Sequence, residues 1–184
     1  MNLMAAVERF ETCEFYTLRL RVSHLSNALN QSVSEVDLVR AALRLLTPKV
    51  TQSLPPEFQS VQNEQSAQAW VQEMMQESHF ILIQIAATQE IIGFMFLDVY
   101  EEAGTQKAHL GYLLGEAFWG QGYASECLAG LIEWCRRTQP VSTLLAGVAA
   151  ENTQSVRLLQ KQGFEEATAD APAGVLFFER CLVS

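Results

Sequence analysis

The segment with the clearest chemical character is LGYLLGEAFWGQGYASE, residues 110–126. A predicted strand at 107–114 enters a loop at 115–122 that holds three glycines, and a predicted helix at 123–137 follows. Amides at a helix N-terminus bind anions together with the helix dipole, and Gly120 and Gly122 would let the backbone approach phosphate oxygens closely. Neither a P-loop lysine nor GxGxxG spacing is present. The loop therefore predicts an anion site of another kind, or a turn that serves packing alone.

A second segment, AENTQSVRLLQKQGF at 150–164, predicts a helix with its own start and stop signals. Asn152 is placed to cap the helix N-terminus, and Gly163 stands where a left-handed glycine ends a helix. Arg157 and Lys161 are four residues apart and share one helix face. They either meet a phosphate group or form a solvated basic face.

The remaining elements must position these two segments. The predicted helices elsewhere cover 34–47 and 64–77, with a loop at 48–63 between them. The predicted strands are 17–22, 80–87, 90–99, 107–114, 142–149, 164–168 and 175–182, with Gly111 as a possible bulge. Hairpin strands followed by strand–helix–strand–helix–strand indicate a mixed α/β (α+β) domain.

Composition narrows the class of protein. The chain has 184 residues and is 49% hydrophobic, which predicts one globular domain and excludes a disordered or fibrous chain. The net charge is -9, which argues against a general nucleic-acid binder. Residues 107–163 carry a net charge of +1, so the remainder sums to -10. This asymmetry favours an anion-binding segment within an acidic body.

The expected localisation rests on the lack of a membrane-spanning segment and of a secretory signal in the sequence. No apolar run approaches the length of about 18 residues that spans a membrane, and residues 1–14 lack the pattern of a secretory signal. We therefore expect a cytoplasmic protein without membrane or nucleic-acid partners. The cysteines show no metal-ligand spacing and are expected to be reduced, packed thiols. They are Cys13, Cys127, Cys135 and Cys181.

Three matching motifs, in order and at suitable spacing, resemble the GNAT superfamily of N-acetyltransferases. They are WGQGYASE at 119–126, ENTQSVRLL at 151–159 and QGF at 162–164. The pattern is most similar to the branch of ribosomal-protein and N-terminal-alanine acetyltransferases. TLRLRV at 17–22 resembles the first strand of that branch, and IIGF at 91–94 the third. The resemblance implies one N-acetyltransferase domain over 1–184. It would have a mixed, mostly antiparallel sheet with helices on both faces, and 107–114 would splay from 142–149 at the cofactor cleft.

The resemblance also implies the donor and its binding residues. Acetyl-CoA would be the donor, a primary amine the acceptor, and no metal would take part. The pyrophosphate would lie beside Gly120 on the amides of Gln121, Gly122, Tyr123, Ala124 and Ser125. Leu113 and Leu114 would pair with the pantetheine arm through their backbone. Asn152 would hydrogen-bond that arm or act only as a cap, and Arg157 would meet the 3′-phosphate or the pyrophosphate.

The catalytic residues are less well determined. Some members of the superfamily use a tyrosine seven residues after the motif asparagine and a glutamate five residues before it. Here these positions are Leu159 and Gly147, so that pair is not carried over. Ser155 is instead the candidate partner of the leaving thiol, or an ordinary first-turn serine. His109 is the candidate base, near Asp98, Glu101 and Glu102, although a structural histidine or a water chain to solvent explains the sequence as well.

Three functions are consistent with these features. The first is an acetyl-CoA-dependent N-acetyltransferase acting on a protein N-terminus or a small amine, by direct attack in a ternary complex. The acidic body would attract a cationic acceptor, and the protein would be a monomer or a homodimer. The second is an acyl-CoA-binding sensor or regulatory domain without turnover, and the third is an interaction domain whose glycine loop only packs.

Overall fold

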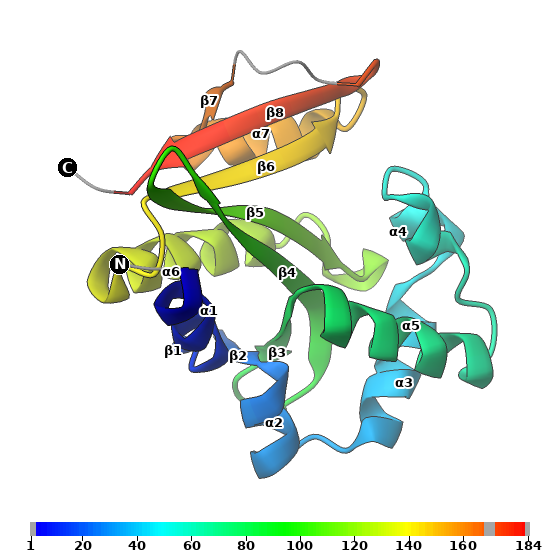
Figure 1. The fold of residues 1–184 in the computed structure, drawn as a ribbon. Helices are drawn as coiled ribbons and strands as arrows, with labels where there is room; N and C mark the ends of the chain where they lie inside the picture. Colours follow the sequence, from blue (N-terminus) through cyan, green and yellow to red (C-terminus); the bar gives the residue numbers. More distant parts are fainter. Residues whose placement is uncertain (1–2, 168–171, 183–184) are drawn as a thin grey trace.

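The computed structural model describes residues 3–167 and 172–182, and its centre is one eight-stranded sheet (Figure 1). The strand order is β1-β2-β3-β4-β5-β6-β8-β7, and neighbours are antiparallel except for β5 and β6. The strands are β1 Glu14–Tyr16, β2 Leu20–His24, β3 His79–Ile85, β4 Ile91–Glu102, β5 Thr105–Leu114, β6 Thr143–Ala149, β7 Glu165–Glu166 and β8 Val175–Cys181.

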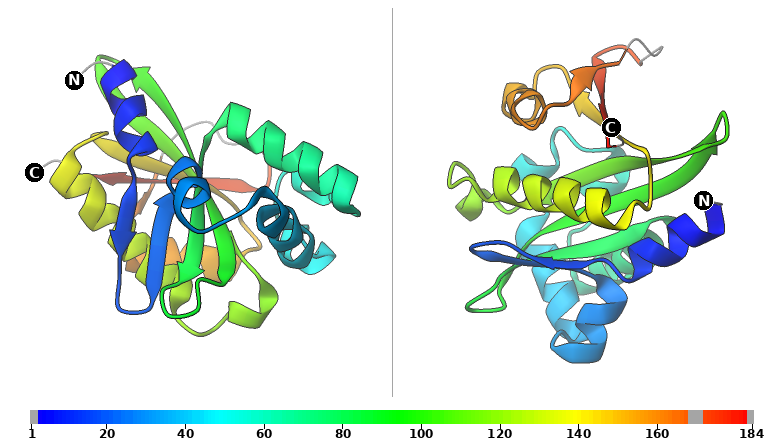
Figure 2. Two further views of the ribbon diagram at one scale, coloured as in Figure 1. Left: turned by 90° about the horizontal axis from the view of Figure 1, so that it is seen from below. Right: turned by 90° about the vertical axis from the view of Figure 1, so that its left-hand side faces the viewer.

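Helices cover both faces of the sheet, as Figure 2 shows for α6 and for the helices of the N-terminal half. The α-helices are α1 Leu3–Glu11, α2 Leu25–Gln31, α3 Glu35–Leu45, α4 Pro48–Thr51, α5 Glu64–Glu77, α6 Tyr123–Thr138 and α7 Thr153–Lys161. Two short 3₁₀ helices, η1 Pro56–Gln59 and η2 Glu116–Phe118, complete the set. None of the described helices is long and apolar enough to cross a membrane.

Two buried clusters hold these layers together. Alternate residues of β5 point to opposite faces, so Leu110 packs with Leu131 of α6 and Leu159 of α7 in one cluster. On the other face, Phe94 of β4 packs around Trp70 of α5 in a cluster that also contains α3. The predicted fold class, with helices on both faces of a mostly antiparallel sheet, is confirmed.

The predicted splay of two strands is confirmed as well. β5 and β6 pair only where residues 107–109 lie beside residues 143–145, although the strands continue to Leu114 and Ala149. Beyond His109 and Leu145 the two strands diverge, as their ribbons show in Figure 1. We call this interruption of the pairing, between residues 110–114 and 146–149, the β5–β6 gap.

Several element boundaries differ from those predicted. The helix at 64–77 is confirmed as α5, but α1, α2 and the short α4 were not predicted. The first half of the predicted strand 17–22 is a turn, in which Thr17 N donates to Leu20 O, and β2 begins only at Leu20. Gly111 is not a bulge, because β4 and β5 pair without a register shift. The shift lies between Ile83 and Gln84 in the β3–β4 pairing.

The C-terminal hairpin and the cysteines are close to expectation. β7 and β8 form the closing hairpin, and the last residue of the predicted strand 164–168 lies outside the described residues. None of the four cysteines is in a disulfide, and burial raises the thiol pKa of Cys13 and Cys127 well above the ordinary value. Cys181 is exposed, so the expectation of a packed thiol is wrong there, because Cys181 is the last residue of β8 and lies beyond the pairing with β7.

Candidate active site

The glycine loop ends in a left-handed residue that opens α6. Gly122, the N-cap residue, has φ +82° and no side chain to cap the helix, and Gly120 has φ +71°. The first amides of a helix have no acceptor within the helix, so this end presents unpaired donors. A Cβ atom at Gly120 would meet nothing within 4 Å. The loop therefore leaves open space at Gly120, close in sequence to the helix end where the family resemblance implies a phosphate.

Contacts from the segment after α3 fix the start of this loop. The Trp119 indole Nε1 donates to Leu114 O at 2.7 Å, and Lys49 Nζ lies 5.3 Å from the centre of the Trp119 ring. Glu116 accepts hydrogen bonds from Thr47 at 2.5 Å and pairs with Lys49 at 3.2 Å, and these contacts lower the pKa of its carboxyl. The region 47–51 thus positions the loop, a role that its polar, proline-containing sequence did not indicate.

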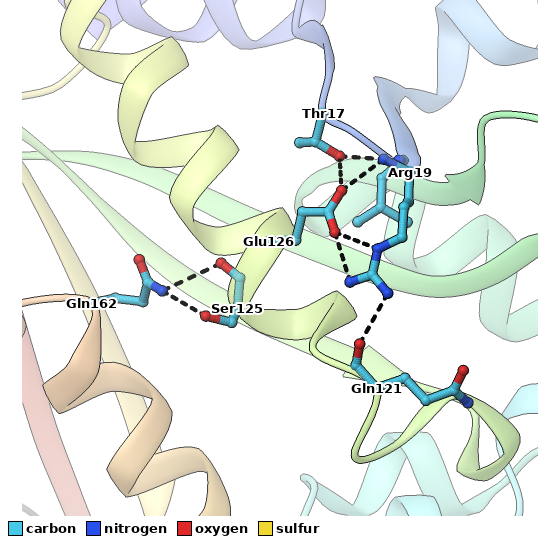
Figure 3. Close-up of polar contacts among 7 residues, drawn as sticks. Thr17, Arg19, Gln121, Ser125, Glu126 and Gln162 are labelled. Carbon is cyan, nitrogen blue, oxygen red and sulfur yellow. Dashed lines mark hydrogen bonds and ion pairs between the residues drawn. The ribbon is translucent and has the colours of Figure 1, made fainter.

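Polar contacts also hold the first turn of α6 from two sides, as Figure 3 shows. Gln162, just after α7, donates to Ser125 Oγ at 2.8 Å. On the other side, Arg19 and Thr17 contact Glu126, and Arg19 also reaches Gln121 O at 3.0 Å. Gln162 belongs to the QGF motif, but Thr17 and Arg19 carried no signal beyond the strand-like alternation of TLRLRV.

The direction of the β5 backbone decides which residues face the β5–β6 gap. Gly115 N donates to Ile92 O in the β4 direction, whereas Gln106 O accepts from Ser142 N in the β6 direction. Backbone groups of successive strand residues point to alternate sides, so even-numbered residues of β5 face β6. Tyr112 therefore directs both of its backbone groups into the gap, and Leu114 directs its N–H there, whereas the Leu114 carbonyl already accepts from the Trp119 indole. Leu113 directs its backbone groups toward β4. This differs from the expectation that its backbone pairs with the pantetheine arm.

Asn152 and Ser155 lie at the start of α7, beside the gap. Asn152 Oδ1 accepts from Ser155 N at 3.1 Å, so the predicted N-cap is present. The buried Tyr112 hydroxyl has no partner of normal hydrogen-bond geometry among the described residues. Burial raises the pKa of Tyr112, and an interaction with the Ser155 side chain partly offsets that rise. Tyr112 thus stands next to the predicted thiol partner, and sequence reasoning missed it.

His109 lies on the opposite face of the sheet. Its ring is exposed and stacks on Tyr100 with centroids 5.1 Å apart, and Phe177 approaches it edge-on at 6.2 Å. Asp98 is its cross-strand partner on β4. Odd-numbered residues of β5 point away from α6 and α7, so the two candidate catalytic residues, His109 and Ser155, are separated by the sheet.

The two positions where some members of the GNAT superfamily carry an acid and a base hold Leu159 and Gly147 here. Leu159 is buried in the core under α7, and a Cβ atom at Gly147 would already lie 3.0 Å from the Phe177 ring. Arg157 is exposed and forms no ion pair among the residues that the structure describes. Within the same described part of the chain, no cluster of three potential metal ligands occurs.

An uncapped, glycine-rich helix N-terminus beside a splayed strand pair defines the class of acyl-CoA-dependent acetyltransferases that the sequence motifs resemble. The family described as "Acetyltransferase (GNAT) domain" matches residues 31–165, and the chain belongs to this family. The prediction of the GNAT superfamily is thereby confirmed.

Individual relatives agree with this assignment. The chain is 32% identical over 91 residues to an uncharacterized N-acetyltransferase, p20, of Bacillus licheniformis, a match that covers 50% of each chain. It is 31% identical over 78 residues to the ribosomal protein uS5-alanine N-acetyltransferase of Escherichia coli (strain K12), covering 42% of this chain and 40% of that one. These matches thus span about half or less of the length of the curated relatives.

A solved structure supports the fold over a longer span. A ribosomal L7/L12 alpha-N-protein acetyltransferase in complex with coenzyme A has a TM-score of 0.70 and 20% identity. The match covers 90% of this chain and 95% of that protein. The fold is therefore shared over nearly the whole chain, and the uS5 relative agrees with the predicted branch of ribosomal-protein acetyltransferases.

Proposed function

We propose that this chain transfers the acetyl group of acetyl-CoA to a primary amine, by direct attack of the amine in a ternary complex. The single observation that carries the proposal is the β5–β6 gap, whose β5 side ends at Leu114, where the glycine loop leads to the uncapped N-terminus of α6. A thioester on an extended arm can enter the gap while a pyrophosphate meets the helix end.

The helix end would bind the phosphates. The first amides of α6 have no acceptor within the helix, and the donor's pyrophosphate would accept hydrogen bonds from them and from the amides of the loop. These are the amides of Gln121, Gly122, Tyr123, Ala124 and Ser125. Arg157 is exposed on α7 and would meet the 3′-phosphate.

The gap would hold the pantetheine arm as an added strand. The backbone groups of Tyr112 and the N–H of Leu114 would pair with it, because the Leu114 carbonyl is taken by Trp119, and Asn152 caps the neighbouring helix α7. An N–H group of this stretch of β5 would polarise the thioester carbonyl as an oxyanion-hole donor. Leu113 would support the arm through its buried side chain rather than through its backbone.

Two protons must move in the reaction. The amine nitrogen forms a bond to the carbonyl carbon, the C–S bond breaks, the amine loses one proton and the thiolate gains one. We assign proton donation to the leaving thiolate to Ser155, whose hydroxyl is next to the buried Tyr112 hydroxyl. His109 or water would remove the proton from the amine, because His109 is exposed on the face from which an acceptor would arrive.

A cationic acceptor fits the charge of that face. The exposed carboxylates of Asp98, Glu102 and Glu179 surround Tyr100, and only Lys107 opposes them. Opposite charge raises the encounter rate and favours protonated amines over neutral or acidic molecules. The acceptor would be a protein N-terminal amine or a small amine, and a ribosomal protein is the substrate named for one relative.

Calorimetry with acetyl-CoA, followed by detection of released thiol, tests the proposal. The acceptor panel should contain N-terminal peptides, polyamines, amino acids and aminoglycosides. We expect saturable binding and thiol release with at least one amine. A folded protein that binds no acetyl-CoA would refute the proposal.

One observation favours a second candidate, a non-catalytic acyl-CoA sensor. Leu159 is buried and Gly147 is closed by Phe177, so this chain lacks the acid and base of some relatives. A sensor would bind acetyl-CoA as tightly as an enzyme but would release no thiol with any member of the panel. Thiol release that the Ser155→Ala substitution reduces would exclude this candidate.

A further inference from the structure

The Glu126 carboxylate occupies an unexpected place for a site that binds an anion. Glu126 is the fourth residue of α6, so its negative charge lies in the first turn, at the end where the pyrophosphate would sit. A carboxylate there interacts well with the helix dipole, but it repels a second anion at the same helix end. Its charge must therefore be compensated before a nucleotide phosphate can bind beside it.

Arg19 and Thr17 supply this compensation from the β1–β2 turn (Figure 3). Glu126 Oε1 accepts from Thr17 Oγ1 at 2.5 Å and from Arg19 N at 2.8 Å, and Oε2 accepts from Arg19 Nε at 2.7 Å. Arg19 Nη2 lies 2.7 Å from the same Oε2 atom. Although burial acts to raise the pKa of Glu126, these hydrogen bonds hold it below its ordinary value, so the carboxylate is ionised.

The same guanidinium holds the glycine loop. Arg19 Nη1 donates to Gln121 O at 3.0 Å, and the guanidinium carbon lies 4.2 Å from the centre of the Tyr123 ring. A Cβ atom at Gly122 would be 3.5 Å from Arg19 Nη2. One side chain therefore contacts residues 121, 123 and 126 and lies beside Gly122, so it overlaps the predicted pyrophosphate site.

The turn that carries Arg19 is itself fixed. Leu20 N donates to Thr17 Oγ1 at 3.0 Å, and Ala86 N donates to Arg19 O at 2.9 Å. The backbone of Arg19 is thus tied to β3 on one side and to Glu126 on the other. The side chain remains 40% exposed, so its charge is also felt at the open side of the loop.

We propose that Arg19 is a positioning residue for the donor site, which sets the backbone of the glycine loop and cancels the Glu126 charge where the pyrophosphate binds. This inference rests on the proposed function, because it takes coenzyme A as the ligand of the loop. It assigns to the N-terminal β1–β2 turn a role in donor affinity that none of the loop's own residues supplies.

The test compares coenzyme A affinity across variants by calorimetry, with thermal unfolding measured in parallel. Arg19→Met should raise the Kd about tenfold, equivalent to about 1.4 kcal/mol, and the loss should shrink at high salt. Arg19→Lys should recover the part due to charge but not the contact with Gln121 O. Arg137→Met is the matched control, since Arg137 forms an exposed pair with Glu133 at the other end of α6.

Glu126→Gln separates positioning from a simple structural tether. Both Arg19→Met and Glu126→Gln break the same ion pair and should lower the melting temperature. Only Arg19→Met leaves an uncompensated negative charge beside the ligand, so Glu126→Gln should bind coenzyme A at least as tightly as the wild type. The double variant should bind more tightly than Arg19→Met alone.

Two results would overturn the inference while leaving the proposed function intact. One is an Arg19→Met variant whose affinity equals that of Arg137→Met, and the other is a Glu126→Gln variant that loses as much affinity as Arg19→Met. If Arg19→Met does not fold, Arg19→Lys and Glu126→Gln still decide between the two readings. A wild-type protein that binds no coenzyme A would instead refute the proposed function, and this inference with it.

Discussion

Three glycines with nearly the same backbone angle allow the donor site to be tested against a matched control. Gly122 (φ +82°) and Gly120 (φ +71°) lie in the glycine loop, and Gly104 (φ +76°) lies at the tip of the β4–β5 hairpin. A Cβ atom would meet nothing within 4 Å at Gly120 or Gly104, and only the Arg19 guanidinium at Gly122. Substitution by alanine therefore introduces mainly backbone strain at all three positions, of about 1–2 kcal/mol.

Whether this strain lowers the stability or the donor affinity depends on the conformation of the unliganded loop. If the unliganded loop keeps its left-handed residues, the free energy of unfolding falls by the full amount and donor affinity is unchanged. If the loop relaxes, stability is preserved and the strain must be met on binding, which weakens the affinity by roughly 5- to 30-fold. For Gly120→Ala and Gly122→Ala the two losses should therefore add to about 1–2 kcal/mol. Gly104→Ala should lose stability alone.

Urea unfolding and calorimetry with coenzyme A measure the two quantities on the same preparations. The reasoning fails if Gly122→Ala keeps both its stability and its affinity, since the left-handed conformation would then have no role. It also fails if Gly104→Ala weakens donor binding, because the effect would not be specific to the loop.

Three further predictions concern other parts of the molecule. Ser155→Ala should lower kcat about 10- to 100-fold with little change in KM for acetyl-CoA, and an unchanged kcat would contradict the role assigned to Ser155. Tyr112→Phe should lower kcat less and leave stability unchanged, because the buried Tyr112 hydroxyl lacks a well-formed hydrogen bond. Burial and the nearby His79 lower the pKa of His24 to about 4, so its contribution to stability is present above pH 6.5 and is lost as the pH falls toward 4. Unfolding at pH 7 and pH 5 should differ by about 1 kcal/mol after allowance for solvent screening, and His24→Asn should remove that part of the difference. Gly163→Ala should lose about 1–2 kcal/mol in urea unfolding, because Gly163 has φ +73°; an unaffected variant would show that the turn after α7 can rearrange.

Local patterns predicted the elements whose signals lie within a few residues. α5 begins after Asn63, which caps it, and places Trp70 and Met74 in the core as its helical spacing indicates. Asn152 and Gly163 frame α7 as predicted. The β5–β6 gap followed from the family resemblance alone, because nothing in the composition of either strand shows where pairing with its neighbour stops.

Contacts between distant residues could not be predicted. TLRLRV alternates like a strand, yet Thr17 closes a turn and Arg19 meets Glu126, 107 positions away. The identity of the partner depends on where α6 crosses β1 and β2, which no local pattern encodes. The same holds for Tyr112. The alternation along its strand indicates that the ring is buried, but it does not show that the hydroxyl lies beside Ser155.

The sheet itself orders the candidate chemistry. Ser155 and Tyr112 lie on the side of the sheet covered by α6 and α7, and His109 and Asp98 lie on the opposite face, at positions that are exposed. A paired sheet would keep these groups apart, since no side chain passes through a continuous hydrogen-bonded ladder. The β5–β6 gap begins directly after His109, where pairing with β6 ends. A carbonyl placed in the gap would therefore be open to an amine from the side of Asp98 while its sulfur remained on the Ser155 face. In the proposed mechanism the break in the ladder would let two separated groups of residues act on one bond.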